Sequence, residues 1–152
     1  MIFLGQVMLS QSEADLLLRM EKQRESNRRW EYPNSGGHLR IPLISVDGKE
    51  SFLLDAGRGR LNLQKRKLQH RARQVIVLAR LDYGGAPHRN PDGEEVGSTH
   101  LHLYREGYED KWAFPIDPGV FTEIGNTMKT LDEFMRFCHI IVAPIIDVDL
   151  YD

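Results

Sequence analysis

Two histidines separated by one residue, His100 and His102, are the side chains best suited by spacing to do chemistry. They stand in the stretch 100–104, His-Leu-His-Leu-Tyr, in which polar and apolar residues alternate. Successive side chains of a strand point to opposite faces, so the two leucines are expected in the core. His100, His102 and Tyr104 are then expected together on the opposite face.

This pattern is open to three interpretations. Histidines at i and i+2 can both bind a metal ion, and His88 or Asp92 from the preceding segment could complete the ligand shell. Two imidazoles can also act as an acid–base pair, because their pKa lies near neutrality. The third interpretation is a polar pair on the wetter face of a sheet. We predict catalytic roles for His88, His100, His102 and Tyr104, with no cofactor; if a metal is bound, the three histidines are its candidate ligands.

Positive charge is concentrated in residues 58–89, which hold nine lysines and arginines against one acidic residue. Residues 90–152 have the opposite balance, with four basic and thirteen acidic residues. Such a separation indicates a surface for polyanions, or neighbouring segments that neutralise each other. The residues predicted to bind phosphate or nucleic acid are Lys65, Arg66, Arg71, Arg73, Arg89 and Arg105.

A basic strand beside the histidine strand would suit RNA cleavage without a metal. One histidine would deprotonate a 2′-hydroxyl and the other would protonate the leaving oxygen. Arginine or lysine would offset the charge of the pentacovalent transition state. The sequence therefore favours a small, toxin-type endoribonuclease as its first functional hypothesis.

The segment 82–98 is a long connection between two expected strands, with four glycines, two prolines and few apolar side chains. Connections of this length in a compact domain are usually functional or disordered. Asn90-Pro91-Asp92-Gly93 is typical of a defined turn, which favours a loop shaped over a site.

Several classes of protein are excluded by the composition and the motifs. The longest apolar runs are shorter than the roughly 20 residues that span a bilayer, so no membrane contact is expected. Cys138 is the only cysteine, which excludes an intrachain disulfide and favours the cytoplasm. A nucleotide-binding P-loop, a Rossmann fingerprint, a nucleophile elbow and a zinc-protease helix are all missing from the sequence.

The expected fold is α+β, with an antiparallel meander of about six strands flanked by an N-terminal and a C-terminal helix. Ser10 and Glu13 have the form of a capping box, and the helix that they begin is expected to fade before Pro33. A second capping box is expected at 130–133, before a helix whose core face holds Leu131, Phe134, Met135 and Cys138. Residues 1–9 are expected to be a flexible extension and residues 10–152 a single domain. The strands are expected at 39–43, 51–55, 61–68, 74–82, 99–105 and 111–116.

One block of the sequence is specific enough to support a resemblance: HRNPDGE at 88–94, HLHLYREGY at 100–108 and DKWA at 110–113, with further support at 53–55 and 69–73. From Met8 onward the chain resembles a family of uncharacterised bacterial and prophage-borne proteins. The resemblance implies no activity, but it implies a context of mobile elements, toxin–antitoxin cargo or phage–host conflict. The chain departs from that family in Met1–Val7 and in His70, where an aromatic residue is more usual.

Two further functions stand beside the ribonuclease. The acidic C-terminal half could imitate a nucleic-acid backbone, as in an inhibitor or antidote that binds a host or defence complex. The third hypothesis is a metal-dependent hydrolase that uses His88, His100 and His102. The partners expected are thus RNA or another nucleic acid, or a protein, and whether the chain is an enzyme stays open, as does its oligomeric state. One fold can host many functions, so fold class does not decide among them.

Overall fold

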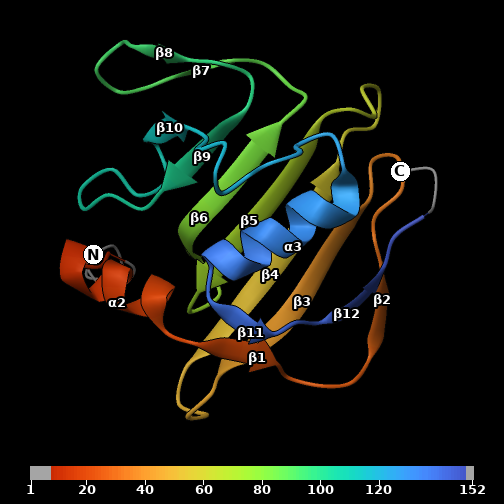
Figure 1. Cartoon of the computed structure of the whole chain (residues 1–152). Coiled ribbons are helices and arrows are strands. Elements are labelled where there is room, and N and C mark those ends of the chain that lie inside the picture. Colours follow the sequence, from red (N-terminus) through yellow and green to blue (C-terminus); the bar gives the residue numbers. More distant parts are fainter. Residues whose placement is uncertain (1–7, 150–152) are drawn as a thin grey trace.

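The computed structural model describes residues 8–149 as an α+β fold with one large sheet (Figure 1). The two helices are α2 (Gln11–Arg19) and α3 (Thr127–Phe137). The strands are β1 (Lys22–Arg24), β2 (Arg29–Glu31), β3 (His38–Ser45), β4 (Ser51–Arg58), β5 (Arg66–Ala72), β6 (Ile76–Tyr83), β7 (His88–Arg89), β8 (Glu95–Val96), β9 (His100–Leu103), β10 (Ala113–Pro115), β11 (Ile140–Val142) and β12 (Ile145–Asp147). The extension expected at 1–9 lies mostly outside the described residues, and Leu9 at its end is buried.

The main sheet has eight strands in the order β10-β9-β6-β5-β4-β3-β1-β11. The six expected strands correspond to β3, β4, β5, β6, β9 and β10, which are antiparallel neighbours. The sheet is nevertheless larger and mixed, because it also contains β1 and β11, which pair in parallel. β1 and β11 have three residues each, and an alternating pattern of that length cannot distinguish a strand from a loop. Two further pairs, β2 with β12 and β7 with β8, lie outside this sheet.

The hydrophobic core lies between one face of the sheet and helix α3, which crosses that face in Figure 1. The expected core face of this helix is confirmed, since Leu131, Phe134, Met135 and Cys138 are all buried. Its expected start was wrong: Asn126 is the N-cap, and its side chain accepts a hydrogen bond from Lys129 N. Asparagine is among the best N-cap residues, so the helix begins one turn earlier than the second capping box suggested.

Helix α2 begins as expected, with a complete capping box between Ser10 and Glu13. It ends at Arg19, far before Pro33, because the chain turns there into strand β1. Lys22 in β1 is fully buried, and its ammonium donates to Leu18 O (2.7 Å) and Cys138 O (2.9 Å). The Leu18 carbonyl lies in the last turn of α2 and the Cys138 carbonyl at the C-cap of α3, where the helix dipole favours a cation. Burial still lowers the pKa of Lys22 from 10.5 to about 8.

The strand expected at 61–68 was placed too early, because β5 spans 66–72 and the preceding residues form a turn. In β5 the residues Arg66, Leu68, His70 and Ala72 are buried toward the core. The alternate residues of β5 face the other side of the sheet, which neither helix covers (Figure 1). Within residues 8–149, neither helix is long and apolar enough to cross a membrane.

Candidate metal centre

Cross-strand register places the polar residues of the uncovered sheet face in two rows. Residues directly opposite on neighbouring antiparallel strands have Cβ atoms about 4.5–5.5 Å apart, so each row is a line of close neighbours. One row runs from β3 to β9 through His38, Gly57, Lys67, Asp82 and His100. The row beside it runs through Arg40, Asp55, Gln69, Arg80 and His102.

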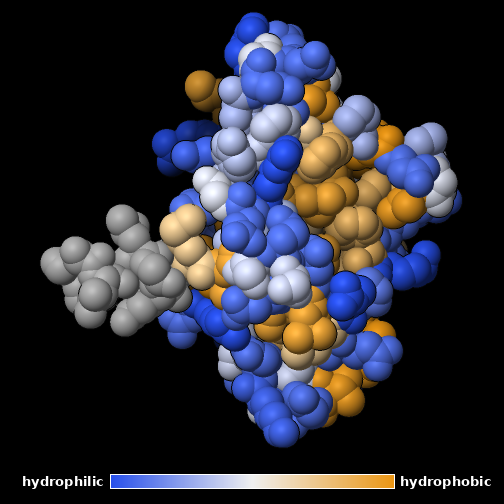
Figure 2. Space-filling view, turned by 90° about the vertical axis from the view of Figure 1, so that its left-hand side faces the viewer, coloured by the Kyte–Doolittle hydropathy of each residue, from blue (hydrophilic) through white to orange (hydrophobic). Residues whose placement is uncertain are grey.

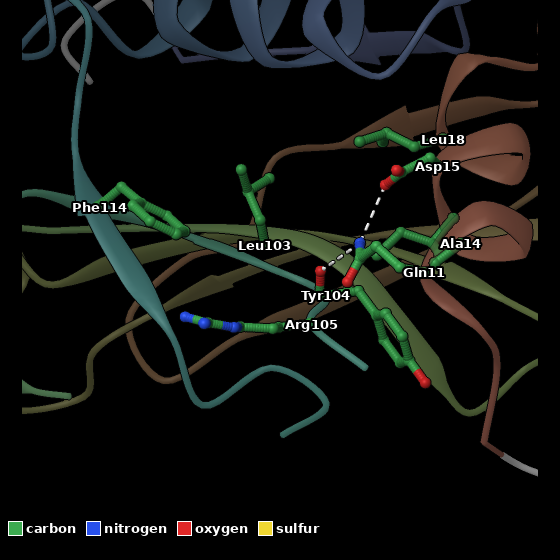
Figure 3. A pocket seen from close by; sticks show the side chains of 9 residues that line it. Gln11, Ala14, Asp15, Leu18, Leu103, Tyr104, Arg105 and Phe114 are labelled. Atoms are coloured by element: carbon green, nitrogen blue, oxygen red, sulfur yellow. Dashed lines mark hydrogen bonds between the residues drawn. The ribbon is translucent and has the colours of Figure 1, made fainter. Parts of the chain in front are cut away.

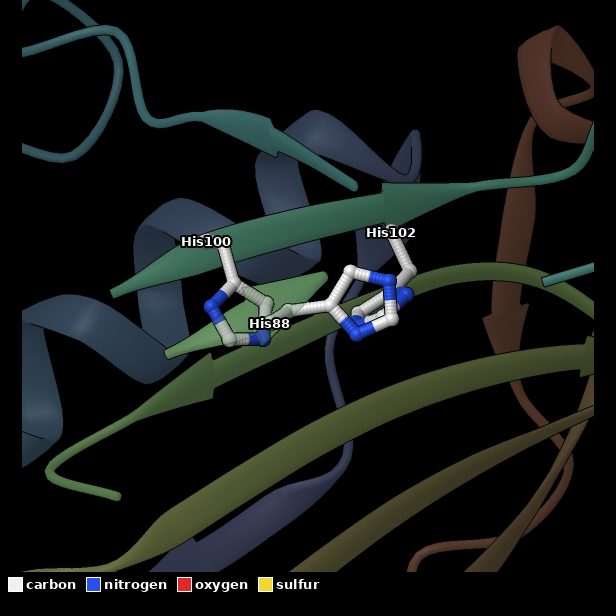
Figure 4. A group of neighbouring side chains, drawn as sticks. All are labelled: His88, His100 and His102. Atoms are coloured by element: carbon white, nitrogen blue, oxygen red, sulfur yellow. The ribbon is translucent and has the colours of Figure 1, made fainter. Parts of the chain in front are cut away.

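The two histidines of β9 lie on the face opposite the core, as the alternation predicted, and His88 from β7 lies over them (Figure 4). The ring centroids of His100 and His102 are 5.0 Å apart, and those of His88 and His102 are 4.6 Å apart. One nitrogen from each of the three rings lies within 4.8 Å of the others. His100 and His102 are only 2% and 1% exposed, because the segment that carries His88 covers them.

Each ring also has one nitrogen at hydrogen-bond distance from a backbone carbonyl oxygen. The pairs are His88 Nε2 with Lys111 O (2.9 Å), His100 Nδ1 with Gly97 O (2.7 Å) and His102 Nδ1 with Asp110 O (2.7 Å). A carbonyl oxygen can only accept, so these nitrogens carry the protons. The lone pairs of the neutral rings are then on His88 Nδ1, His100 Nε2 and His102 Nε2. Metal-binding histidines usually have this second contact to a carbonyl or carboxylate, which orients the ring.

Asp82 faces the same lone pairs from strand β6. Its Oδ2 atom lies 3.4 Å from His100 Nε2 and 3.3 Å from His102 Nε2. Burial disfavours the charge of Asp82, but the close contact with His102 and the charge of Arg80 outweigh burial and lower the pKa of the carboxyl group. Asp82 is therefore a carboxylate at neutral pH.

Arg80 connects the two rows. Its guanidinium donates to Asp110 Oδ2 (2.7 Å) and to His102 Nε2 (3.0 Å), and its Nε lies 3.3 Å from Asp82 Oδ1. The contact with His102 confirms that this Nε2 carries a lone pair, since guanidinium can only donate. The Asp82 and Asp110 carboxylates thus both lie against the Arg80 guanidinium, beside the three imidazoles.

The connection 82–98 is a shaped loop, because it contains the β7–β8 hairpin. Asn90 fixes this hairpin: its Oδ1 accepts from Ala113 N (2.8 Å) and its Nδ2 donates to Ala113 O (2.9 Å). The amide thus pairs with β10 as a neighbouring strand would, and Ala113 in turn lies opposite His102. This contact positions His88 over β9.

Replacing Asn90 with alanine should therefore weaken metal binding without removing a ligand. The change leaves two buried backbone groups of Ala113 unpaired, at a cost of about 1–3 kcal/mol each if the loop stayed closed. We expect the loop to open instead and zinc affinity to fall about 10–100-fold, as for other groups that orient a ligand. Competition with a chromogenic chelator measures this. Asn27→Ala, at an exposed asparagine bonded to Arg24, is the control, and equal affinities in the two variants would contradict the assigned role.

A pocket of about 570 Å³ adjoins the histidines on this face. Its lining includes His88, His100, Asp82 and Arg80, and also Lys65 and Arg66 from the basic segment. Both are predicted phosphate-binding residues, but Arg66 faces the core, where its guanidinium donates to Thr127 Oγ1. The others lie elsewhere: Arg71 is bound by Asp55 (2.7 Å), Arg73 by Glu50 and Arg89 by Glu95 (3.3 Å each), and Arg105 lies over the Trp112 ring (4.3 Å).

Tyr104 is not part of the histidine cluster, contrary to the face predicted for it. Strand β9 ends at Leu103, and the Tyr104 hydroxyl instead donates to Leu9 O (2.7 Å) and accepts from Leu9 N (2.8 Å). Tyr104 lines a different, largely apolar hollow of about 310 Å³ between α2 and the sheet (Figure 3), on the side of the molecule that Figure 2 shows to carry a hydrophobic area. At this hollow the Gln11 amide donates to Asp15 and to the Tyr104 carbonyl.

Tyr104→Phe is therefore expected to affect folding and leave the histidine site intact. The variant loses two buried hydrogen bonds, which should lower the free energy of unfolding by about 1–3 kcal/mol. Urea unfolding measures this loss, and a zinc titration of the same protein should match the wild type. Tyr108→Phe, at a more exposed ring, should change stability by less than about 0.5 kcal/mol. A large loss of zinc affinity in Tyr104→Phe would contradict this placement.

The model of one protein family, described as a family of unknown function (DUF6978), matches residues 9–140. The chain belongs to DUF6978. The match includes all three histidines, Asp82 and both helices, so the DUF6978 region contains the whole candidate site. Neither the curated proteins nor the solved structures compared with this DUF6978 chain include a match.

Asp82, Arg80 and Lys67 are the site residues that the sequence analysis did not select. Asp82 was assigned both to the end of the strand expected at 74–82 and to the start of the loop, and it is the penultimate residue of β6. The signal was present in the strand pattern, because Arg80 and Asp82 are two apart in a strand and so share a face. Their pairing with β9 is a long-range contact, which the sequence of a single strand does not reveal.

Proposed function

We propose that this chain is a metal-dependent hydrolase in which His88, His100 and His102 bind one divalent metal ion, with zinc as the best match. The observation that carries the proposal is the approach of three imidazoles, one nitrogen of each lying within 4.8 Å of the others, on rings that are each held by a backbone carbonyl. Three histidines and one open position are typical of catalytic zinc. Tetrahedral zinc with bonds of about 2.1 Å would hold its nitrogens about 3.4 Å apart. The three nitrogens lie within 4.8 Å of one another, so zinc binding would shorten the distances between them by up to about 1.4 Å.

Asp82 is the residue best placed to act on a water molecule at the fourth position. Zinc would lower the pKa of a bound water molecule to about 7, so the proton would need an acceptor near the metal. The Asp82 carboxylate faces both β9 histidines at 3.3–3.4 Å and can accept that proton. A water molecule that gave its proton to Asp82 would attack the substrate, and Asp82 would return the proton to the leaving group, so that one water would be consumed for each bond cleaved.

Arg80 supports the same reaction. Arg80 now donates to His102 Nε2, and if that lone pair bound a metal ion, the Arg80 N–H would be free to face the metal site. Asp110 keeps the guanidinium in place through its 2.7 Å ion pair. Arg80 can then donate to the oxygen on which negative charge develops.

The geometry favours this function over a ribonuclease that works without a metal. Acid and base in such an enzyme must reach two different oxygens of one phosphate. His100 and His102 instead point to a single carboxylate and are almost fully buried. The metal-free ribonuclease, the inhibitor that binds through acidic surface, the mobile-element context and the cytoplasmic location all stay predictions from the sequence.

Asp82→Asn tests the proposal, because asparagine keeps the shape of the side chain and cannot accept the proton. The assay is hydrolysis of a panel of nitrophenyl acetate, phosphate and phosphodiester esters by metal-stripped protein and by protein loaded with zinc, manganese or cobalt. We expect hydrolysis by a loaded form, and a loss of about 10²–10⁴-fold in Asp82→Asn at unchanged metal content. A zinc-loaded wild type that hydrolyses none of these esters would contradict the hydrolase and leave a structural metal site.

A further inference from the structure

The pocket beside the histidines is strongly basic. Five lysines and arginines border it, namely Arg58, Lys65, Arg66, Lys67 and Arg80; Lys67 and Arg80 lie on the uncovered face of the sheet, whereas the Arg66 guanidinium lies on the core side and donates to Thr127 Oγ1. Asp82 is the one carboxylate of the lining, and it is already opposed by Arg80 at 3.3 Å. A pocket with this excess of positive charge is suited to an anionic ligand.

Lys67 is the lysine closest in register to the candidate metal centre. It lies opposite Asp82 on one side and opposite Gly57 on the other, on the uncovered face of the sheet. Its side chain is exposed, and within residues 8–149 no carboxylate lies within 4.0 Å of its ammonium group. This charge is therefore available to a ligand in the pocket.

Gly57 lies beside Lys67, and neither backbone conformation nor packing requires glycine there. It belongs to strand β4 and does not have a positive φ angle. An added Cβ atom would meet only His38 Nδ1, at 3.7 Å, which is an ordinary contact. Glycine inside a strand destabilises it by roughly 0.5–1 kcal/mol relative to alanine, and it often marks the close approach of a ligand. Gly57 thus leaves a bare patch of backbone between Lys67 and His38.

The size and walls of the pocket favour a small molecule over a polymer. Its volume of about 570 Å³ lies within the roughly 300–1,000 Å³ of small-molecule sites. The turn between β4 and β5 forms one wall, and Asn62 Nδ2 ties that turn to Gly84 O (3.1 Å). Gly57 and Asp82 are two strands apart, which corresponds to roughly 10 Å.

We propose that this pocket binds a phosphorylated small molecule of nucleotide size, with its phosphate over Gly57 and beside Lys67. The phosphate is a recognition group, and the bond to be hydrolysed lies roughly two strand spacings away, near the metal. The inference rests on the proposed function for that bond, but the phosphate subsite itself needs no metal.

The test measures phosphate binding with metal-stripped protein, so that failure of the metal site does not affect it. The probes are inorganic phosphate, adenosine 5′-monophosphate and adenosine, measured by calorimetry. We expect phosphate and the nucleotide to bind, and adenosine to bind at least about tenfold more weakly than the nucleotide, since a charged hydrogen bond contributes about 1.5–3 kcal/mol. Gly57→Val and Lys67→Ala should each lower the affinity for phosphate at least about tenfold.

Matched variants separate this effect from a change in the fold. Gly125→Val adds the same side chain at another glycine with open space around it, and Lys49→Ala removes a lysine from a distant turn; both should bind like the wild type. Gly57→Val should unfold at or above the wild-type temperature, because its site is an unstrained strand position. Three results would each overturn the proposal. The first is equal binding of nucleotide and adenosine, and the second is an unchanged affinity for phosphate in Gly57→Val. The third is an RNA oligonucleotide that binds more tightly than the nucleotide, with an affinity that Gly57→Val does not change. Phosphate binding without zinc binding would overturn only the proposed hydrolase.

Discussion

Replacing His102 with glutamine is expected to lower the affinity for zinc by at least about a hundredfold. Groups that merely orient a metal ligand contribute 10–100-fold to affinity, and His102 supplies a ligand atom itself. Glutamine keeps most of the side-chain volume at this buried site, so the variant should still fold. Zinc competition with a chelator of known affinity measures the effect, and circular dichroism checks the fold.

His38→Gln is the matched control for this experiment. His38 lines the same pocket and lies in the same row as His100, but it is exposed, and its Nε2 lies 3.6 Å from Asp55, in strands β3 and β4 at the other end of the rows from β9. Its replacement should leave zinc affinity unchanged. Equal zinc affinities for the two variants would show that the three-histidine cluster is not the binding site.

Acid is expected to destabilise the protein through a different histidine, His70. This side chain is fully buried in the core, where its ring stacks on Phe52 with centroids 5.3 Å apart. Burial, assisted by the charge of Lys22, lowers the pKa of His70 from 6.5 to about 3. Its Nδ1 contacts Leu53 O (3.1 Å), whereas its Nε2 has no hydrogen-bond partner among the described residues.

The sign of the effect follows from proton uptake. Above pH 6.5 His70 is neutral in both the folded and the unfolded state, so this group does not lower the free energy of unfolding. Between pH 6.5 and about 3 only the unfolded state takes up the proton, and stability falls by about 1.4 kcal/mol for each pH unit. At pH 4.5 the loss from this group is therefore about 3 kcal/mol, and below pH 3 it no longer grows.

His70→Phe should remove this part of the pH dependence, because phenylalanine can stack on Phe52 and cannot be protonated. Urea unfolding at pH 7.0, 5.5 and 4.5 measures the free energy of unfolding of the wild type and the variant. The slope between pH 6.5 and 4.5 should be shallower in His70→Phe and unchanged in His38→Gln, which alters an exposed imidazole. Parallel profiles for wild type and His70→Phe would contradict the buried, neutral state of His70.

Local signals in the sequence predicted the elements whose patterns are long or well capped. The capping box at Ser10, the apolar face of the closing helix and the alternation in 100–103 all appear in the structure. The first helix was predicted too long because the end of α2 depends on Lys22, whose ammonium is held by carbonyls of two helices far apart in sequence. The three-residue strands β1 and β11 depend likewise on their partners, and a sequence pattern of that length contains too little information.

The sequence analysis predicted the histidines of the candidate site but missed the residues around them. Alternation is a property of one strand, so it was enough to put His100 and His102 on a common face. Asp82 and Arg80 join them only through the register between β6 and β9, and His88 only through the contact of Asn90 with β10. Tyr104 was assigned to the wrong face because the strand ends one residue before it. Long-range pairing, which a single sequence does not display, accounts for each of these differences.

The central claim is a metal ion held by three converging imidazoles, and anomalous X-ray scattering from zinc-soaked crystals tests it most directly. Data collected on both sides of the zinc absorption edge locate zinc independently of any assumption about the protein. The account predicts one strong peak per chain, about 2.0–2.1 Å from nitrogens of His88, His100 and His102, with Asp82 beside the remaining position. A zinc peak elsewhere with this cluster empty, or no peak at all, would contradict it.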